Sequence, residues 1–203
     1  RFKEEVRKNA DFLPAVNKLG KEGYDGRGVQ LLKKAEDLDK AFEAPGLLEK
    51  FIDFDKELAV IVSRNESGEV ESFPSVECAF HPEHNLVEFL FSPASIDPDT
   101  ENKARELAVK IIEKLGMVGL LAVEMFLTRS GELLVNEIAP RPHNSGHHTI
   151  EANFTSQFEQ HLRAVMGMPL GDTGYRCPAA MVNLLGEDGF TGEAYVEGLD
   201  EAV

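Results

Sequence analysis

Two glutamates that flank a short turn are the residues of this sequence best suited to chemistry. Residues 118–127 and 133–138 have the pattern of paired β-strands, and Ser130 and Gly131 between them are typical turn residues. With a two-residue turn, paired residue numbers add up to 261, so that Glu124 lies opposite Glu137 on one face. Like charges in that position destabilise a sheet. We therefore predict that a magnesium ion joins the two carboxylates, because their hard oxygens suit it.

Neutral oxygen ligands for such an ion are available close by in Asn136 and Asn144. A hairpin that turns both carboxylates outward into water is the alternative, but Leu133 and Val135 make the second strand apolar and favour its burial. The pairing depends on the turn, because a three-residue turn would shift the register by one residue.

The segment KLGKEGYDGRG, residues 18–28, has the composition of a phosphate-binding loop. Its glycines let the backbone turn tightly and present N–H groups to phosphate oxygens, and its basic side chains add positive charge. These residues are Gly23, Gly26 and Gly28, with Lys18, Lys21 and Arg27. The segment lacks the order of a P-loop, and a strand rather than a helix follows it, which argues against a dinucleotide fingerprint. A flexible connection between two strands is the simpler alternative.

The segment PRPHNSGHH, residues 140–148, follows the hairpin and is too rich in turn residues for regular structure. Its polar side chains are Arg141, His143, Asn144, Ser145, His147 and His148. An arginine can hold a phosphate or carboxylate with two hydrogen bonds, and a histidine exchanges protons near neutral pH. A zinc site at His143 and His147 is disfavoured, because Pro142 and Gly146 exclude the helix that would align them. A capped surface loop is the alternative to a binding loop.

A charged segment, EKFIDFDKEL at residues 49–58, offers groups that suit a nucleoside. Glu49 and the backbone of Phe51 and Ile52 could pair with an adenine edge. Glu57 is an acceptor for ribose hydroxyls. A charged edge strand explains the same residues without a ligand, so both interpretations stay open.

The composition argues against several other functions. The chain has 203 residues, 42% of them hydrophobic, which is enough for one large domain or two small ones. A net charge of -15 repels nucleic acids, although residues 1–34 carry nine basic and five acidic side chains. No apolar run reaches the length of a membrane span. The two cysteines, Cys78 and Cys177, are too few for a disulfide framework and fit the reducing cytoplasm.

The elements that must position these residues alternate between strands and helices. The clearest is a helix over residues 98–115, with Asp97 as its N-cap and Gly116 as its stop. The sequence predicts further helices at 3–12, 37–42 and 154–166, and strands at 15–18, 29–32, 47–51, 57–63, 70–73 and 179–185. The helix at 154–166 is amphipathic, with Phe154 and Leu162 on its apolar side.

Three motifs together resemble the ATP-grasp ligases, and among them the enzymes that carboxylate 5-aminoimidazole ribonucleotide. They are GYDGRG at residues 23–28, EKFIDFDKEL at 49–58 and NEIAPRPHNSGHHT at 136–149. The resemblance implies an α+β ATP-grasp fold of antiparallel sheets with packed helices over residues 1–168, followed by the start of a small C-terminal β domain at 175–203. Because family members carry a further domain of roughly a hundred residues before this region, we expect the chain to be a fragment.

The resemblance also implies a role for each motif. Lys18 and the loop of Gly23, Tyr24, Asp25, Gly26, Arg27 and Gly28 would hold the phosphates of ATP. Glu49, Lys50, Phe51 and Ile52 would hold the adenine and Glu57 the ribose, with His81 and Asn136 in the same nucleotide site. Glu124 and Glu137 would bind magnesium. Tyr24, Asp25 and Arg27, with Arg141, His143, Asn144 and Ser145, would line the site for 5-aminoimidazole ribonucleotide and bicarbonate.

The implied reaction is the ATP- and magnesium-dependent carboxylation of 5-aminoimidazole ribonucleotide by bicarbonate. It runs through carboxyphosphate to N5-carboxyaminoimidazole ribonucleotide in purine (IMP) biosynthesis. The resemblance further implies a homodimer in the cytoplasm, with no nucleic-acid or membrane partner. Two alternatives stay open: another ATP-grasp carboxylate ligase, which the PRPHNSGH segment disfavours, and a non-catalytic nucleotide-binding module.

Overall fold

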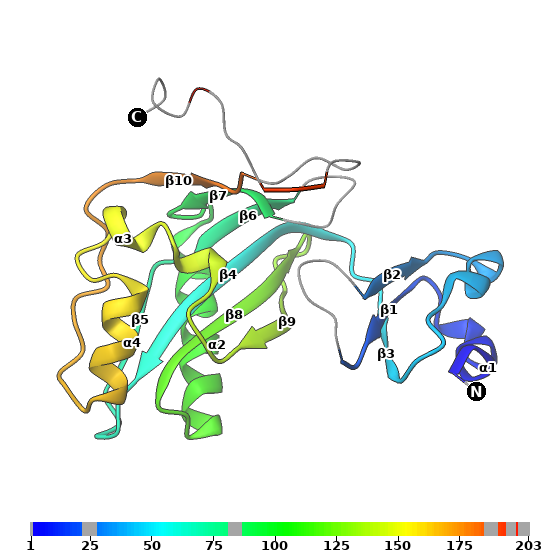
Figure 1. Cartoon of the computed structure of the whole chain (residues 1–203), viewed down its shortest axis with the longest axis horizontal. Coiled ribbons are helices and arrows are strands. Elements are labelled where there is room, and N and C mark those ends of the chain that lie inside the picture. Colours follow the sequence, from blue (N-terminus) through cyan, green and yellow to red (C-terminus); the bar gives the residue numbers. More distant parts are fainter. Residues whose placement is uncertain (1, 22–27, 81–86, 185–190, 194–197, 199–203) are drawn as a thin grey trace.

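The protein consists of a smaller and a larger antiparallel sheet with helices packed against them (Figure 1). The computed structural model describes residues 2–21, 28–80, 87–184, 191–193 and 198. Within these residues the α+β class predicted from the sequence is confirmed. None of the helices in this part of the chain has both the length and the apolar character needed to cross a membrane.

The smaller sheet is built from three short strands near the N-terminus. They are β1 (Ala15–Leu19), β2 (Val29–Leu32) and β3 (Gly46–Lys50), in the order β2-β1-β3. Helix α1 (Phe2–Lys8) and the 3-10 helices η1 (Ala10–Phe12) and η2 (Ala35–Lys40) accompany them. Val6, Leu32 and Leu38 form a small core between α1, β2 and η2. The strands predicted in this region are confirmed to within two residues.

The larger sheet contains seven strands and carries the hairpin singled out in the sequence. The strands are β4 (Phe54–Arg64), β5 (Val70–Ser72), β6 (Val76–Phe80), β7 (Val87–Ser92), β8 (Gly119–Thr128), β9 (Leu133–Ala139) and β10 (Ala179–Val182). Their order is β10-β7-β6-β4-β8-β9, and β5 pairs with β4. The sequence analysis missed β6 and β7.

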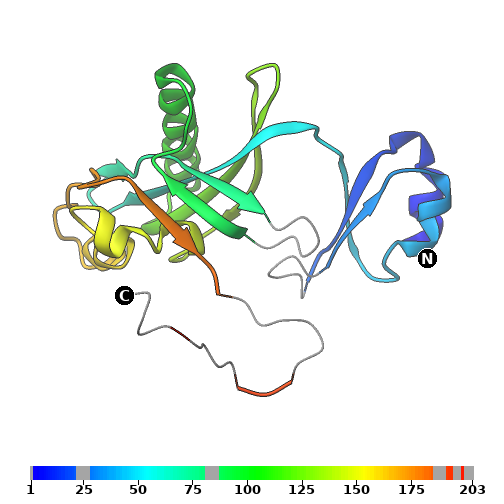
Figure 2. The same ribbon diagram turned by 90° about the horizontal axis from the view of Figure 1, so that it is seen from above.

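A connection of three residues, 51–53, leads from β3 of the smaller sheet directly into β4 of the larger one (Figure 2). Such a short link keeps the two sheets close to each other. A hydrogen bond from Lys18 of β1 to Asn136 of β9 joins them a second time, across 118 positions of the sequence. The two sheets are therefore joined both by residues 51–53 and by the contact of Lys18 with Asn136, and several predicted site residues lie at this junction.

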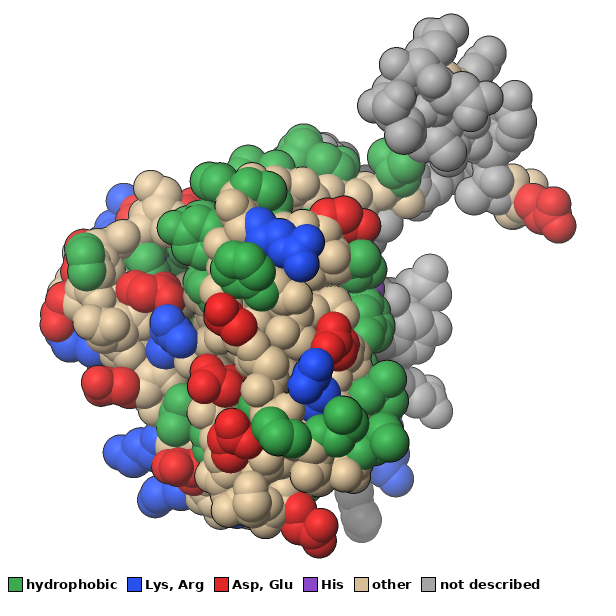
Figure 3. Space-filling view, turned by 90° about the vertical axis from the view of Figure 1, so that its left-hand side faces the viewer, with side chains coloured by type: hydrophobic (Ala, Val, Ile, Leu, Met, Phe, Trp, Pro, Cys, Tyr) green, Lys and Arg blue, Asp and Glu red, His purple; other side chains and the backbone are tan. Residues whose placement is uncertain are grey.

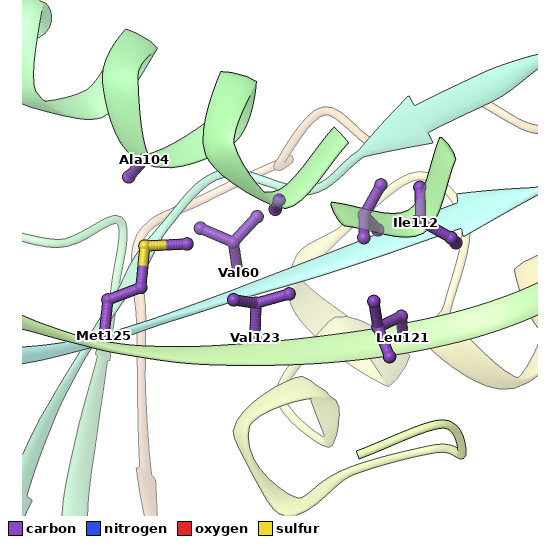
Figure 4. Packing of buried hydrophobic residues seen from close by; sticks show 8 residues of the cluster. Val60, Ala104, Ile112, Leu121, Val123 and Met125 are labelled. Atoms are coloured by element: carbon purple, nitrogen blue, oxygen red, sulfur yellow. The ribbon is translucent and has the colours of Figure 1, made fainter. Parts of the chain in front are cut away.

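Helix α2 (Pro98–Leu115) covers one face of the larger sheet. It begins at the predicted cap, since the Asp97 carboxylate accepts hydrogen bonds from the N–H groups of Asp99 and Thr100. It ends at Gly116, whose φ of 59° lies in the left-handed region. Its inner side chains pack against β4 and β8 (Figure 4). The core consists of Val60, Val62, Ala104, Ala108, Ile112, Leu121, Val123 and Met125.

The segment that follows β9 lies over part of the opposite face of the larger sheet, where it contacts β4 and β8. It contains the 3-10 helix η3 (Asn144–Gly146) and the helices α3 (Thr149–Ala152) and α4 (Gln157–Val165). Helix α4 starts three residues later than predicted, because Ser156 caps it by accepting a hydrogen bond from the Glu159 N–H at 3.1 Å.

The inner side of α4 is polar, which the sequence did not predict. Gln157 and Gln160 are completely buried, whereas Phe154 and Leu162 are 55% and 57% exposed. Buried glutamine amides are stable only when the surrounding chain supplies their hydrogen-bond partners. Figure 3 views this side of the molecule and shows hydrophobic side chains gathered between acidic and basic ones.

Strand β10 extends the larger sheet beyond β7, with Ala179 opposite Ser92 and Val182 opposite Phe89. It ends three residues earlier than predicted. The boundary between a domain over residues 1–168 and a small β domain that starts at 175 stays a prediction. Within the described residues, the strand that follows residue 175 pairs with the larger sheet.

Candidate functional site

The hairpin of β8 and β9 places Glu124 directly opposite Glu137, as the sequence predicted. The route to this pairing differs from the predicted one. The turn is not a two-residue turn at Ser130-Gly131, because Leu127 pairs with Leu133 and the register near the turn is offset by one residue. A β-bulge between Met125 and Glu124 then inserts one extra residue in β9, and this insertion restores the pairing of the two glutamates.

The extra residue of the bulge is Asn136, since Val135 pairs with Met125 and Glu137 pairs with Glu124. A bulge bends its strand and redirects a side chain, and bulges are frequent next to active sites. Here the redirected residue is the one that meets the smaller sheet. The predicted pairing of Glu124 with Glu137 is thus correct, but it arises from a longer turn and a bulge that offset each other, not from a two-residue turn.

A third carboxylate, that of Glu57 on β4, lies on the same face of the sheet. Ala59 is the partner of Glu124, and Glu57 is two residues along the strand, so the two glutamates are diagonal neighbours. Burial, followed by the charges of Glu124 and Glu137, raises the pKa of Glu57 to about 8. Burial and then the charge of Glu137 raise the pKa of Glu124 to about 7. The three carboxylates therefore form a site that favours an added positive charge.

Lys18 brings positive charge to this site from the smaller sheet. Its Nζ donates a hydrogen bond to Asn136 Oδ1 at 2.9 Å and lies 2.8 Å from Glu49 Oε2. Its charge also opposes the raised pKa values of Glu57 and Glu124. The structure thus brings the predicted phosphate-binding lysine together with residues predicted for the adenine and the metal ion.

His143 reaches the glutamates from the loop after β9. Its Nε2 lies 3.4 Å from Glu124 Oε1, and its Nδ1 accepts a hydrogen bond from the Ser145 N–H at 3.3 Å. Ser145 Oγ lies 2.9 Å from the same nitrogen. Burial, with the charges of Arg141 and His147, lowers the pKa of His143 to about 4. The ring is therefore neutral at pH 7, and it carries its proton on Nε2, toward Glu124.

The rest of this loop is held partly by residues that the sequence analysis missed. Asn144 donates a hydrogen bond to Asn183 Oδ1 at 3.0 Å, just after β10. Gln157 of α4 bonds to the backbone of His143. Asn183 and Gln157 have no recognisable sequence signal, because a single amide side chain does not by itself indicate which residue it will contact. Arg141 is exposed, and its guanidinium donates to the Pro142 carbonyl at 3.1 Å.

The predicted adenine segment lies at the junction of the two sheets. Lys50 ends β3 and is exposed, and Ile52 is half-buried in the connection to β4. The Phe51 N–H donates to the Pro14 carbonyl at 3.1 Å, so this N–H is already engaged. The Glu49 carboxylate pairs with Lys18. Recognition of adenine by these residues stays a prediction.

Several predicted residues lie outside the part of the chain that the structure describes. They are Gly23, Tyr24, Asp25, Gly26, Arg27 and His81. The end of the glycine segment is described, and Gly28 has a φ of 77°, which only glycine adopts without strain. Its carbonyl accepts a hydrogen bond from the Leu19 N–H at 2.8 Å, so the two ends of the segment are held together.

The residues described here do not form a complete metal centre on their own. No group of three or more His, Cys, Asp or Glu side chains among them is arranged to hold a metal ion. Glu124 and Glu137 nevertheless present oxygens from neighbouring strands, and burial and repulsion raise the pKa of Glu124. This donor set fits magnesium, which typically takes one or two carboxylates and completes its shell with water and phosphate oxygens.

Comparisons with known proteins match both the sequence and the fold. The sequence profile of the ATP-grasp domain matches residues 3–158. N5-carboxyaminoimidazole ribonucleotide synthase of Bacillus subtilis (strain 168) is 48% identical over 180 residues, which cover 87% of this chain and 47% of that protein. The crystal structure of N5-carboxyaminoimidazole ribonucleotide synthetase from Thermotoga maritima aligns with a TM-score of 0.83 and 46% identity, covering 100% of this chain and 52% of that one.

A third relative was solved with ligands. The crystal structure of N5-carboxyaminoimidazole synthase from Aspergillus clavatus in complex with ADP and 5-aminoimidazole ribonucleotide aligns with a TM-score of 0.82 and 32% identity. The alignment covers 92% of this chain and 50% of that one. This chain therefore spans about half the length of the relatives that it matches.

The matched region contains the smaller sheet, the hairpin and the loop after β9. Lys18, the paired glutamates and His143 therefore all lie inside it. The antiparallel sheets with packed helices are the fold that the resemblance of the sequence motifs implied. The chain belongs to the ATP-grasp family.

Proposed function

We propose that the protein containing this chain uses ATP to carboxylate 5-aminoimidazole ribonucleotide with bicarbonate, giving N5-carboxyaminoimidazole ribonucleotide. The observation that carries the proposal is the convergence of Lys18, Glu124, Glu137 and His143 between two sheets and a loop. Relatives named for this product support it, as does the one solved with ADP and 5-aminoimidazole ribonucleotide. The product places the reaction in purine biosynthesis, and the free Cys78 and Cys177 agree with a cytoplasmic location.

In this proposal ATP arrives with magnesium, and Glu124 and Glu137 bind the ion. Bound magnesium would supply positive charge that offsets the charge on the phosphates. The Asn136 Oδ1 atom, now bonded to Lys18, would lie beside them. Lys18 itself would neutralise phosphate oxygens, because its ammonium group lies beside Glu49 and close enough to Glu124, one of the proposed magnesium ligands, to affect its pKa.

The other residues would act mainly by holding the reactants in position. A bicarbonate oxygen attacks the γ-phosphorus and ADP leaves. The C–O bond of the resulting carboxyphosphate then breaks, the amino nitrogen of the ribonucleotide forms a bond to the carboxyl carbon, and the released phosphate takes up the proton that the amine loses. His143, directed at Glu124 and hydrogen-bonded to buried Ser145, would shape this site, and Arg141 would offer a guanidinium to these anions. Positioning and charge stabilisation account for most of the rate in phosphoryl transfer, and exclusion of water protects a labile carboxyphosphate.

The partner that we propose for the intact protein is a second copy of the same chain, bound through the apolar side of α3 and α4. Its exposed large side chains are Ile150, Phe154, Phe158, Leu162, Val165 and Met166. Each of them is between 39% and 69% exposed, so that the side of α3 and α4 they share is largely apolar and open to a partner. Twofold pairing is the commonest way for one chain to cover such a surface with itself.

The test of the proposed reaction is ADP release by the protein at the full length of its relatives, with bicarbonate and 5-aminoimidazole ribonucleotide added or omitted. We expect rapid ADP formation only when both are present, together with equal amounts of the carboxylated product. ADP formation that depends on a different acceptor would favour another ATP-grasp ligase. Nucleotide binding without any ADP release would favour a binding module and contradict the proposal.

A further inference from the structure

The side chain of Gln157, at the start of α4, is completely buried against the loop that carries the predicted substrate residues. Its Oε1 accepts a hydrogen bond from the His143 N–H at 2.8 Å, and its Nε2 donates to the His143 carbonyl at 2.8 Å. The Nε2 atom also lies 2.8 Å from His147 Nδ1. The amide thus pairs with His143 as a neighbouring strand would, and each of its polar atoms has a partner.

The contact between Gln157 and the loop is as close as the backbone permits. A Cβ atom at Gly146 would lie 2.5 Å from Gln157 Oε1, so that the glycine is required for the approach. Thr149 Oγ1 accepts a hydrogen bond from the Gln157 N–H at 2.8 Å and donates to the Gly146 carbonyl. Helix α4 and residues 143–149 are therefore tied together on both sides of this glutamine.

These contacts control where the side chain of His143 lies. Its imidazole reaches Glu124 on one side and Ser145 on the other. A shift of the His143 backbone by a fraction of an ångström would alter both distances, and displacements of this size at a reacting centre have large effects on rate.

We infer that Gln157 is a positioning residue for the site of 5-aminoimidazole ribonucleotide and bicarbonate. It acts through the backbone of His143 and contacts neither substrate. The inference rests on the proposed function for the identity of the substrate. It goes beyond that function because it assigns the alignment of the loop to a side chain on a separate helix.

The same helix offers a matched control. Gln160 is also completely buried, and its amide pairs with one backbone residue in the same manner. Its Oε1 accepts from the Gly171 N–H at 2.8 Å, and its Nε2 donates to the Gly171 carbonyl at 3.1 Å. Gly171 belongs to the connection after α4 and none of these hydrogen bonds involves a predicted site residue. Replacing either glutamine by methionine removes two hydrogen bonds to one backbone residue at nearly constant volume, and in Gln157 it also removes the contact with His147 Nδ1.

The experiment compares Gln157→Met and Gln160→Met in the protein at the full length of its relatives. Both substitutions should lower the melting temperature, Gln157→Met by at least as much as Gln160→Met, because it also loses the contact with His147. In Gln157→Met alone, we expect about a tenfold higher KM for 5-aminoimidazole ribonucleotide with an unchanged KM for ATP. Hydrogen exchange of the His143 amide should also become about tenfold faster in this variant alone, because the N–H loses its acceptor.

Two outcomes would overturn the inference. One is an equal change of the ribonucleotide KM in both variants, which would indicate a general loss of stability. The other is an unchanged exchange rate of the His143 amide in Gln157→Met. If the unmodified protein forms no ADP with the ribonucleotide, the proposed function fails by itself. The exchange rates of the two variants then still decide whether Gln157 positions the loop.

Discussion

The electrostatic character of the site comes from three glutamates that share one face of a sheet. Burial is the first cause of the raised pKa values of Glu57 and Glu124, and mutual repulsion is the second. Lys18 opposes the rise of both pKa values, and the charge of Arg141 also opposes that of Glu124. The acidic charge at this site therefore exceeds the basic charge, and the magnesium ion that we propose for Glu124 and Glu137 would offset part of it.

Replacing Glu137 by glutamine tests its role as a magnesium ligand. Because Glu137 is exposed and its removal reduces the repulsion on Glu124, we expect little change in melting temperature or a small increase. ADP formation should fall by about a hundredfold or more, since one of two charged ligands is lost. Glu132→Gln, at the turn of the same hairpin, serves as a control and should leave the rate unchanged. Undiminished ADP formation in Glu137→Gln would exclude the role.

At the scale of elements, helix α2 supports the glutamates from behind, because it packs against the opposite face of β4 and β8. Its stability depends on the cap at its first turn. The Asp97 carboxylate accepts two backbone hydrogen bonds and one from the Thr100 hydroxyl at 2.6 Å. The hydrogen bonds with Thr100 lower the pKa of Asp97 below its usual value.

Removal of this cap tests how far α2 contributes to stability. We expect Asp97→Ala to lower the free energy of unfolding by about 1 kcal/mol, the usual cost of losing an aspartate cap. Urea denaturation measures this change. Asp99→Ala removes an exposed carboxylate that forms an ion pair with Lys103, and it should cost clearly less. An equal loss in the two variants would contradict the assignment of the cap.

The elements were predictable where local signals were complete. Helix α2 has a cap, a proline at its first position and a glycine stop, and its bounds are those that the sequence predicted. The hairpin had a clear turn signal, but its predicted turn was one residue too short. The bulge at Asn136 compensates for this difference, so the two glutamates still pair. No sequence rule places a bulge, because it depends on how β9 bends toward the smaller sheet. The residues 22–27 and 81–86 lie outside the described structure, so their predicted roles stay predictions.

Contacts formed only in the folded protein were not predictable. The sequence indicated that α4 buries its phenylalanines and leucine, yet its glutamines are inside. Their partners, His143 and Gly171, are separated from them by 14 and 11 positions and offer backbone groups that carry no sequence signal. The predicted site residues Lys18, Glu124 and His143 do come together, because each belongs to a motif with a distinct composition.

At the scale of the whole molecule, acid should remove the part of the stability that comes from one buried histidine, His148. Burial lowers the pKa of His148 from 6.5 to about 4, so the unfolded chain takes up a proton at a higher pH than the folded protein does. Stability from this residue is present above pH 6.5 and is lost as the pH falls toward 4, by about 3 kcal/mol at most. We expect His148→Phe to lose less melting temperature between pH 7.5 and pH 5 than the unmodified protein. Equal losses would exclude His148 as the cause.

The proposed dimer is a second property of the whole molecule. A charge on the apolar side of α4 should disrupt it, because a buried and unpaired carboxylate is costly. We expect Leu162→Glu to halve the mass measured by light scattering after gel filtration of the protein at the full length of its relatives. Glu113→Lys, on the exposed side of α2, should leave the mass unchanged. A monomeric unmodified protein would refute the dimer.

In the proposed function, Asn136 and Glu49 would compete with a nucleotide phosphate for the ammonium group of Lys18. Asn136 and Glu49 hold the ammonium group at 2.9 and 2.8 Å and engage two of its three N–H donors. A phosphate that takes over these donors would bind with an affinity reduced by the free energy needed to break the contacts of Lys18 with Asn136 and Glu49. The same exchange would remove a hydrogen bond that joins the smaller sheet to the larger one, so that binding of the phosphate would be coupled to the contact between the two sheets.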